Sequence, residues 1–188
     1  EEMYISKGTV ISPSTEGLLF VVRGGVKFQL TGQEAALWLN GRFQFVDEKT
    51  EDERRCLKKL KRMGLAETSQ SQSEAEKYRI LTQCVLYPAV PKRIRHHTTK
   101  KEREMLDWLM KAGLHLTVAE LVCLNEKGIS PTEDLLYSYN RQALTEAIYL
   151  DHSIQDNVLE AQMEHSPARD VTVATILSLL RKKRILLL

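Results

Sequence analysis

The sequence has few aromatic residues and no excess of charge of either sign. Aromatic residues make up 6% of the 188 residues, and 27 lysines and arginines nearly balance 25 aspartates and glutamates. A net charge of +2 excludes a polycation that coats nucleic acid indiscriminately, so any nucleic-acid role must come from local patches. The apolar residues are mostly Leu, Val, Ile and Ala, which favours helices packed on helices with a few short strands. We therefore predict a mainly helical α+β protein of one or two domains.

Long apolar runs and cysteine pairs are also missing. No run approaches the roughly 20 residues that cross a bilayer, and the stretch EEMYISKGTV has neither the positive nor the apolar region of a signal peptide. We predict a cytoplasmic protein with no membrane partner. Cys56, Cys84 and Cys123 are odd in number and form no CxxC pair. We expect buried thiols in a reducing compartment.

Sequence motifs for phosphate, metal or nucleophile chemistry do not occur. The sequence contains no GxxxxGK[ST], GxGxxG, GxSxG, HExxH or EF-hand pattern. His96 and His97 are adjacent, but the other histidines are scattered, unlike the closely spaced ligands of a structural metal site. We predict no metal, no cofactor and no enzymatic activity. Trp38 and Trp108 lie in apolar helical stripes, so we interpret them as core residues.

One pattern occurs twice in the chain. Residues 55–68 read RCLKKLKRMGLAET, and residues 175–188 read TILSLLRKKRILLL. In a gapless alignment their apolar positions coincide, and Gly64 falls against Arg184. Each stretch predicts an amphipathic helix with a basic end that runs into a short apolar strand.

The first half alternates short strands and helices. Runs 17–22 and 26–30 are β-type and are separated by two glycines, which predicts a hairpin. Thr31 then stands as a helix N-cap, and Glu34 completes the capping-box pattern T-x-x-E. The helix that it opens, GQEAALWLN, leads to a third predicted strand, RFQFV.

A longer helix at 51–63 follows an acidic run and precedes a predicted wing. Gly64 is its predicted stop. Its core-facing stripe consists of Cys56, Leu57, Leu60 and Met63. We predict a strand at 65–68, a polar turn SQSQSEAE and a returning strand at 77–87, which together form a long β-hairpin.

The second half is richer in helix. A basic stretch with prolines at 91–101 is interpreted as a domain linker. Helices are predicted at 100–113, from Thr117 with Glu120 in a capping box to Gly128, from Ser130 as cap with Pro131 in the first turn, at 154–164, and from about 170 to 184. In the helix at 100–113 the predicted inward residues are Met105, Leu106, Trp108, Leu109 and Met110.

This order of helix, strand, polar tip and returning strand resembles the winged helix-turn-helix superfamily of transcription regulators. The residues that carry the resemblance are Leu57, Leu60, Gly64 and Leu65 with the hairpin to Tyr87, and in the second copy Thr172, Ile176, Leu177, Leu180, Ile185 and Leu186. It implies tandem winged-helix-like domains at 1–90 and 102–188, joined by the basic linker 91–101, the first with a long β-hairpin wing. The second copy departs from the pattern, because Arg184 replaces the glycine and no returning strand follows.

The last helix is the better candidate for reading DNA. The helix at 51–63 opens among four carboxylates, which stabilise a helix dipole but repel phosphate. The candidate DNA-contacting residues are Arg169, Thr172, Thr175, Ser178 and Arg181 on one face of the last helix, with Lys182, Lys92, Arg93 and Arg95 on phosphates. An ordinary surface helix with a solvated basic linker accounts for the same residues.

Two functions follow as hypotheses. The first is a DNA-binding transcriptional regulator that contacts duplex DNA through helix 170–184, in which a homodimer would present two reading helices one DNA turn apart. The alternative is a non-enzymatic protein–protein interaction module built from degenerate winged-helix units. Its docking surface would be an edge strand or the acidic helix.

Overall fold

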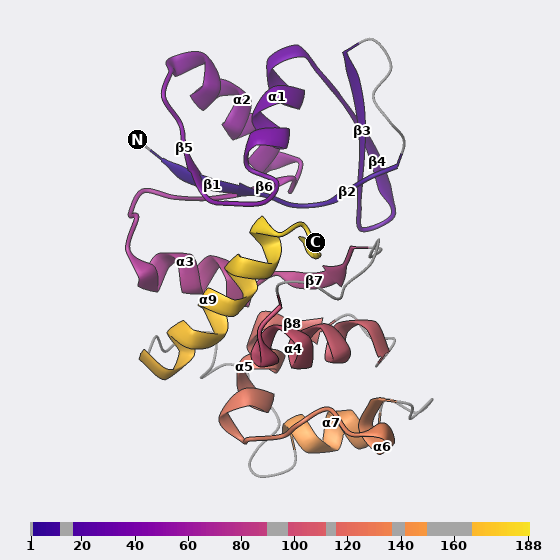
Figure 1. The fold of residues 1–188 in the computed structure, drawn as a ribbon. Coiled ribbons are helices and arrows are strands. Elements are labelled where there is room, and N and C mark those ends of the chain that lie inside the picture. Colours follow the sequence, from indigo (N-terminus) through magenta and orange to yellow (C-terminus); the bar gives the residue numbers. More distant parts are fainter. Residues whose placement is uncertain (1, 12–16, 90–97, 112–115, 137–141, 150–166) are drawn as a thin grey trace. The chain divides into compact units, whose positions relative to one another are not determined.

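The structure of the protein is a computed structural model that describes residues 2–11, 17–89, 98–111, 116–136, 142–149 and 167–188 (Figure 1). The fold is α+β, with helices and three small sheets. The chain divides into two compact units. Unit 1 comprises Glu1–Ile80 and Leu186–Leu188, and unit 2 comprises Leu81–Ile185.

Unit 1 contains two sheets of three strands each. In the first, β1 (Met3–Ser6) lies between β5 (Val46–Asp47) and β6 (Ala66–Ser69) and is antiparallel to both. The predicted strand RFQFV is thereby reduced to its last residue and Asp47. In the second sheet, β3 lies between β2 and β4.

The predicted hairpin at 17–30 is confirmed. It pairs β3 (Leu18–Arg23) with β4 (Val26–Thr31) in a continuous register, and β2 (Thr9–Val10) pairs with the other side of β3. The turn residues Gly24 and Gly25 have φ of 57° and 79°. Positive φ at both positions is what a two-residue hairpin turn requires, and glycine adopts it without steric cost.

Two helices cover the first sheet of unit 1 and lie side by side (Figure 1). They are α1 (Gly32–Asn40) and α2 (Glu51–Arg62), and their positions agree with the predictions. Thr31 is the N-cap of α1, but its side chain makes no capping hydrogen bond. Glu34 instead receives a hydrogen bond of 2.6 Å from Lys59 of α2, so the predicted capping box is wrong. The central core of unit 1 includes Tyr4, Leu30, Trp38, Leu57 and Leu60.

The predicted wing at 65–87 is wrong. β6 pairs with β1, and the chain then forms α3 (Glu74–Thr82) where the returning strand was expected, followed by β7 (Val85–Pro88). Ser73 initiates this helix, because its side chain and its carbonyl oxygen both accept from the amide of Glu76. The segment EAEKYRILT is also rich in good helix formers, and that propensity outweighs its β-branched content.

Unit 2 is mainly helical. Its elements after β7 are α4 (Lys100–Lys111), β8 (Leu116–Thr117), α5 (Val118–Glu126), α6 (Glu133–Leu136), α7 (Gln142–Tyr149) and α9 (Pro167–Arg181), and β7 pairs antiparallel with β8. The strand β9 (Ile185–Leu187) begins at the last residue of unit 2. The capping box of Thr117 and Glu120 is confirmed. The predicted helix start at Ser130 is wrong, since α6 begins at Glu133. The predicted helix at 154–164 and most of the predicted linker lie outside the described residues.

The apolar stripe of α4 is buried as predicted, with one exception. Trp108 is 4% exposed, which confirms it as a core residue, whereas Met110 is 41% exposed, so its inward assignment is wrong. A helix turns 100° per residue, so five apolar residues within six positions cannot all face one side. In the part of the chain that the structure describes, no helix is long and apolar enough to cross a membrane.

Candidate functional site

The polar face of α9 that the sequence assigns to DNA packs at its N-terminal end against α5. Arg169 is 8% exposed, and its Nε donates to Oε1 of Glu126 at 2.7 Å. Thr172 is 4% exposed, and its hydroxyl oxygen accepts from Nδ2 of Asn125 at 3.0 Å. Because Glu126 and Asn125 belong to α5, these contacts join the two helices inside unit 2.

Further along α9, two side chains converge on a buried carboxylate of α4. The hydroxyl of Ser178 donates to Oε1 of Glu102 at 2.7 Å, and Nζ of Lys182 lies 2.9 Å from Oε2. The amide of Thr99 donates to the same carboxylate at 2.9 Å. Burial raises the pKa of Glu102, but the bonds from Ser178, Lys182 and Thr99 outweigh it and hold this pKa below its usual range. Glu102 therefore ties the start of α4 to the end of α9.

The other predicted DNA contacts are more accessible or lie outside the described residues. Thr175 is half-buried, and its hydroxyl donates to the carbonyl oxygen of Val171 at 2.8 Å. Arg181 is exposed at the end of α9. Lys92, Arg93 and Arg95 lie outside the described residues. The accessible part of the predicted interface is thus the C-terminal end of α9.

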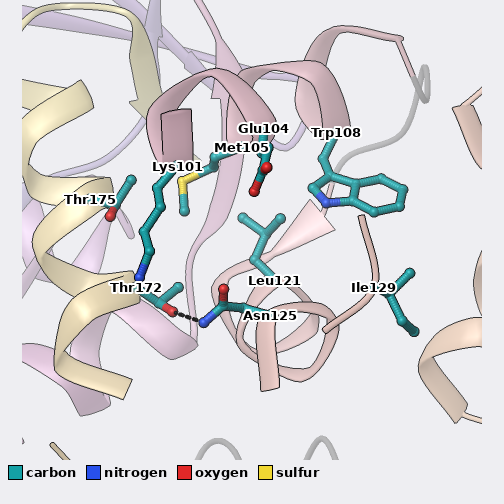
Figure 2. Close-up of a pocket in the computed structure, with 9 residues that line it drawn as sticks. All are labelled: Lys101, Glu104, Met105, Trp108, Leu121, Asn125, Ile129, Thr172 and Thr175. Carbon is teal, nitrogen blue, oxygen red and sulfur yellow. Dashed lines mark hydrogen bonds between the residues drawn. The ribbon is translucent and has the colours of Figure 1, made fainter. Parts of the chain in front are cut away.

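A small cavity opens where α4, α5 and α9 meet (Figure 2). Its volume is about 50 Å³. Met105, Trp108, Leu121 and Ile129 form its apolar lining. The polar side chains that line it are those of Lys101, Glu104, Asn125, Thr172 and Thr175. Two threonines that the sequence assigns to DNA, Thr172 and Thr175, therefore line this cavity.

Several polar groups at the cavity have unused hydrogen-bonding capacity. Within the described part of the chain, the indole N–H of Trp108 and the ammonium group of Lys101 enter no hydrogen bond or ion pair. Glu104 has one distant ionic neighbour, Nζ of Lys100 at 3.9 Å. Asn125 donates to Thr172, which leaves its carbonyl oxygen unused. Lys101 and Asn125 are exposed and Glu104 is 40% exposed, so solvent reaches these groups and the cavity is an open one.

The second candidate surface is the outer edge of β4 in unit 1. Among the described residues, β4 pairs only with β3, so its other edge is open. In a two-residue hairpin the pair next to the turn exchanges both hydrogen bonds, and hydrogen-bonded pairs then alternate with non-hydrogen-bonded ones. Arg23 and Val26 form the hydrogen-bonded pair next to the turn. Lys27 and Gln29 therefore belong to non-hydrogen-bonded pairs, and their backbone N–H and C=O groups point away from β3.

The side chains of β4 alternate between the core and solvent. Leu30 is buried and Phe28 packs against the core, whereas Lys27 and Gln29 are exposed on the opposite face. Nζ of Lys27 lies 4.3 Å from the ring centroid of Phe20, a cation–π geometry. Val26 belongs to the core-facing set but is 54% exposed at the open edge.

The acidic run before α2, the other docking surface considered from the sequence, has a structural explanation. Thr50 and Glu53 form a capping box, each backbone amide donating to the other side chain at 3.2 Å. Glu48 is 2% exposed and accepts from Nε of Arg54 at 2.7 Å. Glu53 thus caps the start of α2, and the stabilisation of the helix dipole by the other carboxylates stays a prediction.

The described residues contain no candidate metal site. No group of three histidine, cysteine, aspartate or glutamate side chains there is placed to hold a metal ion. None of the three cysteines forms a disulfide, and Cys84 and Cys123 are buried as predicted, whereas Cys56 is half-buried. Burial raises the pKa of the Cys123 thiol. The absence of enzymatic activity stays a prediction.

The cavity was not found from the sequence, and the edge strand considered there as a docking surface was not identified as β4. A signal for the cavity does exist, because Lys101, Glu104 and Trp108 follow one another at spacings of three and four on a single helix face. It points to a common face, but not to a cavity. The open edge depends on strand order, which the hairpin pattern alone does not specify.

Comparisons with protein-family models, with curated proteins and with solved structures find no match for this chain. The winged-helix resemblance therefore stays a prediction, and the site arguments depend on geometry alone.

Proposed function

We propose that this protein is a non-enzymatic interaction module that binds an extended segment of a partner protein as an additional strand on β4. The observation that carries the proposal is the regular, open edge of β4. Strand addition uses main-chain hydrogen bonds for affinity and alternate side chains for specificity.

The edge of β4 has few of the features that prevent pairing. Natural edge strands are commonly very short, or contain proline, a bulge or several charges. β4 has six residues, its register with β3 is uninterrupted, and it contains no proline. Its one charged residue is Lys27, whose ammonium group already lies over Phe20.

The chemistry beside the edge defines the partner segment. On the core-facing side, Val26 and Phe28 offer apolar surface next to the open edge. On the opposite side, Lys27 offers a positive charge and Gln29 an amide. We therefore expect an extended segment in which apolar residues alternate with acidic or polar ones.

A peptide-display experiment tests the proposal. A library of random 12-residue peptides is selected on the whole chain, and the affinity of enriched peptides is measured by fluorescence anisotropy. We expect Gln29→Pro to weaken their binding at least about tenfold, because proline removes an outward N–H without disturbing the pairing with β3. Gln29→Thr keeps that N–H and is the matched control.

Amide hydrogen exchange adds an independent readout. In the free protein the amides of Lys27 and Gln29 should exchange faster than those of Phe28 and Leu30, and a bound peptide should protect the first two. Enriched peptides that bind Gln29→Pro as tightly as the wild type would refute strand addition. Loss of a dimer in Gln29→Pro, measured by light scattering without peptide, would instead identify a second copy of this chain as the occupant.

DNA binding is the second candidate, and a specific observation favours it. Glu102 joins the start of α4 to the end of α9, so basic side chains of both helices gather there. Those that are exposed are Lys100, Lys101, Arg103, Arg181, Lys182 and Lys183. This cluster supports phosphate contacts.

The DNA hypothesis is tested by binding to random-sequence duplex DNA across a salt series. Arg181→Glu/Lys183→Glu is the appropriate variant, because both residues are exposed, whereas Arg169 is buried against Glu126. Affinity that falls steeply with salt and collapses in the variant would support phosphate contacts at the end of α9. No binding at low salt would exclude the regulator in its simple form.

A further inference from the structure

The C-terminal end of α2 gathers positive charges from two elements of unit 1. Lys58, Lys61 and Arg62 are exposed there, and Lys58 is a surface neighbour of both others because they follow it by three and four residues. Like charges at this spacing repel one another. A fourth cation comes from β3, because the guanidinium group of Arg23 lies against Gly64. These four cations form the basic end of α2.

The carboxylates of the elements that pack against α2 are already paired. These elements are α1 and β6, and each carries a single carboxylate. Glu34 of α1 lies 2.6 Å from Nζ of Lys59, and Glu67 of β6 lies 3.2 Å from Nζ of Lys7. Neither carboxylate therefore compensates the basic end of α2.

The four cations have no anionic partner within the part of the chain that the structure describes. Arg23, Lys58 and Arg62 enter no hydrogen bond or ion pair there, and Lys61 donates only to the neutral hydroxyl of Thr68, at 2.9 Å. A helix dipole supplies only about half a negative charge at the C-terminus of a helix. The dipole alone thus leaves most of this positive charge uncompensated.

The small extent of this surface favours a short acidic protein segment over a nucleic acid. Glu51 and Asp52, at the start of the same helix, are 59% and 74% exposed. Asp52 is only about 9 Å from Lys58 along the helix axis, since a helix rises 1.5 Å per residue. Duplex DNA carries one charge per about 1.7 Å, so phosphates that continue along α2 would meet these carboxylates. A short run of carboxylates can end where the cations end.

We propose that the basic end of α2 binds a short acidic segment of a partner protein, whose carboxylates pair with Lys58 and Arg62 along the helix and with Arg23 at its end. Arginine holds a carboxylate through two parallel N–H donors, so the two arginines orient the segment. Pairs between exposed charges are screened by salt, which makes the binding salt-dependent. This site requires no strand addition to β4, so either proposal can fail alone.

Binding of an acidic probe to the whole chain provides the test. The probe is a fluorescein-labelled peptide of eight glutamates, a peptide of eight glutamines is the uncharged control, and fluorescence anisotropy is recorded from low to physiological salt. We expect only the glutamate peptide to bind, with an affinity that falls as salt rises. Lys58→Gln/Arg62→Gln should weaken its binding about fivefold, the effect of losing two exposed ion pairs.

A matched variant removes the same charge elsewhere. Lys49→Gln/Arg103→Gln also loses two exposed cations, one before α2 and one on α4, and should bind the glutamate peptide like the wild type. Amide spectra locate the contact independently. In ¹H–¹⁵N correlation spectra of the whole chain, the amides of Lys58, Arg62 and Gly64 should shift when the glutamate peptide is added.

Four outcomes would overturn the proposal. The first is no binding of the glutamate peptide at low salt. The second is equal affinity in the two glutamine double variants, which would place the peptide elsewhere. The third is binding that is lost in Arg181→Glu/Lys183→Glu or in Gln29→Pro but not in Lys58→Gln/Arg62→Gln. The fourth is tighter binding of a DNA oligonucleotide of equal charge that Lys58→Gln/Arg62→Gln weakens, which would make the surface a nucleic-acid site.

Discussion

The C-terminal ends of α2 and α9 have the same hydrogen-bond geometry but different residues at the position that reverses the chain. The amide of Leu65 donates to the carbonyl oxygen of Leu60 at 2.8 Å, and the amide of Arg184 donates to that of Leu179 at 2.9 Å. Each bond closes over a residue with positive φ, Gly64 at 71° in α2 and Lys183 at 56° in α9. The structural match is thus shifted by one residue from the gapless sequence alignment, which sets Gly64 against Arg184.

The polar faces of the two helices differ more than their ends. On α2, Leu57 and Leu60 are buried, while Arg55 and Lys58 are exposed. On α9, polar side chains face α4 and α5, and they find partners there. A helix covered on more than one side must bury part of its polar face, and buried polar groups need hydrogen bonds. An apolar stripe therefore identifies a helix, but it does not show which polar residues are free to bind a ligand.

The largest expected effect on stability separates Glu102, the buried partner of α9, from its more accessible neighbour Glu104. Glu102→Gln removes the charge that Ser178 and Lys182 contact, and we expect it to lower the free energy of unfolding by about 2 kcal/mol. Glu104 lies on the same helix and is more exposed, so Glu104→Gln should lower the free energy of unfolding by less than about 0.5 kcal/mol. Urea unfolding curves measure both. Equal midpoints would show that Glu102 is not a link between α4 and α9.

The stability difference between wild type and Glu102→Gln is also expected to depend on pH. The folded pKa of Glu102 is lowered, so the stability that its charge provides is present above the unfolded pKa of about 4.3 and is lost as pH falls through the folded pKa. The difference in unfolding free energy between wild type and Glu102→Gln should therefore shrink below about pH 4. A difference that stays constant between pH 7 and pH 3 would contradict this assignment.

The two arginines of the predicted DNA face form the next test. Arg169 is buried against Glu126, so Arg169→Ala should lower the free energy of unfolding by about 2 kcal/mol. Arg181 is exposed, so Arg181→Ala should change the free energy of unfolding by less than about 0.5 kcal/mol. Thermal unfolding of both variants at low salt decides the point. The arginine comparison fails if Arg181→Ala is the more damaging change.

The end of α2 is expected to depend on glycine. An alanine at position 64 would have to adopt positive φ, and its Cβ would meet the guanidinium group of Arg23. We expect Gly64→Ala to cost about 1–2 kcal/mol of unfolding free energy. Gly17→Ala is the control, because that glycine also has positive φ but nothing lies within 4 Å of an added Cβ. The difference between the two variants measures the contact with Arg23, and the absence of a difference would exclude it.

Much of the helical fold could be predicted from the sequence, because its signals are local. The cap at Thr117, the stop at Gly64 and the glycine turn of the β3–β4 hairpin each depend on neighbouring residues, and the structure confirms them. The wing was not predictable in this way. Its first strand pairs with β1, about 60 residues earlier, and no local pattern specifies that partner.

The candidate site was predicted less well than the fold. Thr172 and Ser178 were assigned to DNA from their spacing, but their surroundings depend on Asn125 and Glu102, which lie 47 and 76 residues away. Spacing defines a helix face. It does not define what packs against that face, so the cavity required the tertiary structure.

The smallest expected effect decides between the two alignments of α2 and α9. Lys183 has a φ of 56°, a conformation that costs a side chain about 1 kcal/mol, so Lys183→Gly should raise the free energy of unfolding by up to that amount. Arg184 does not have positive φ, and Arg184→Gly should lower the free energy of unfolding by about 0.5–1 kcal/mol, because glycine only adds freedom to the unfolded chain there. Urea midpoints of the two variants give the answer. Stabilisation by Lys183→Gly alone supports the structural match, whereas stabilisation by Arg184→Gly would restore the gapless alignment and move the end of α9 by one residue.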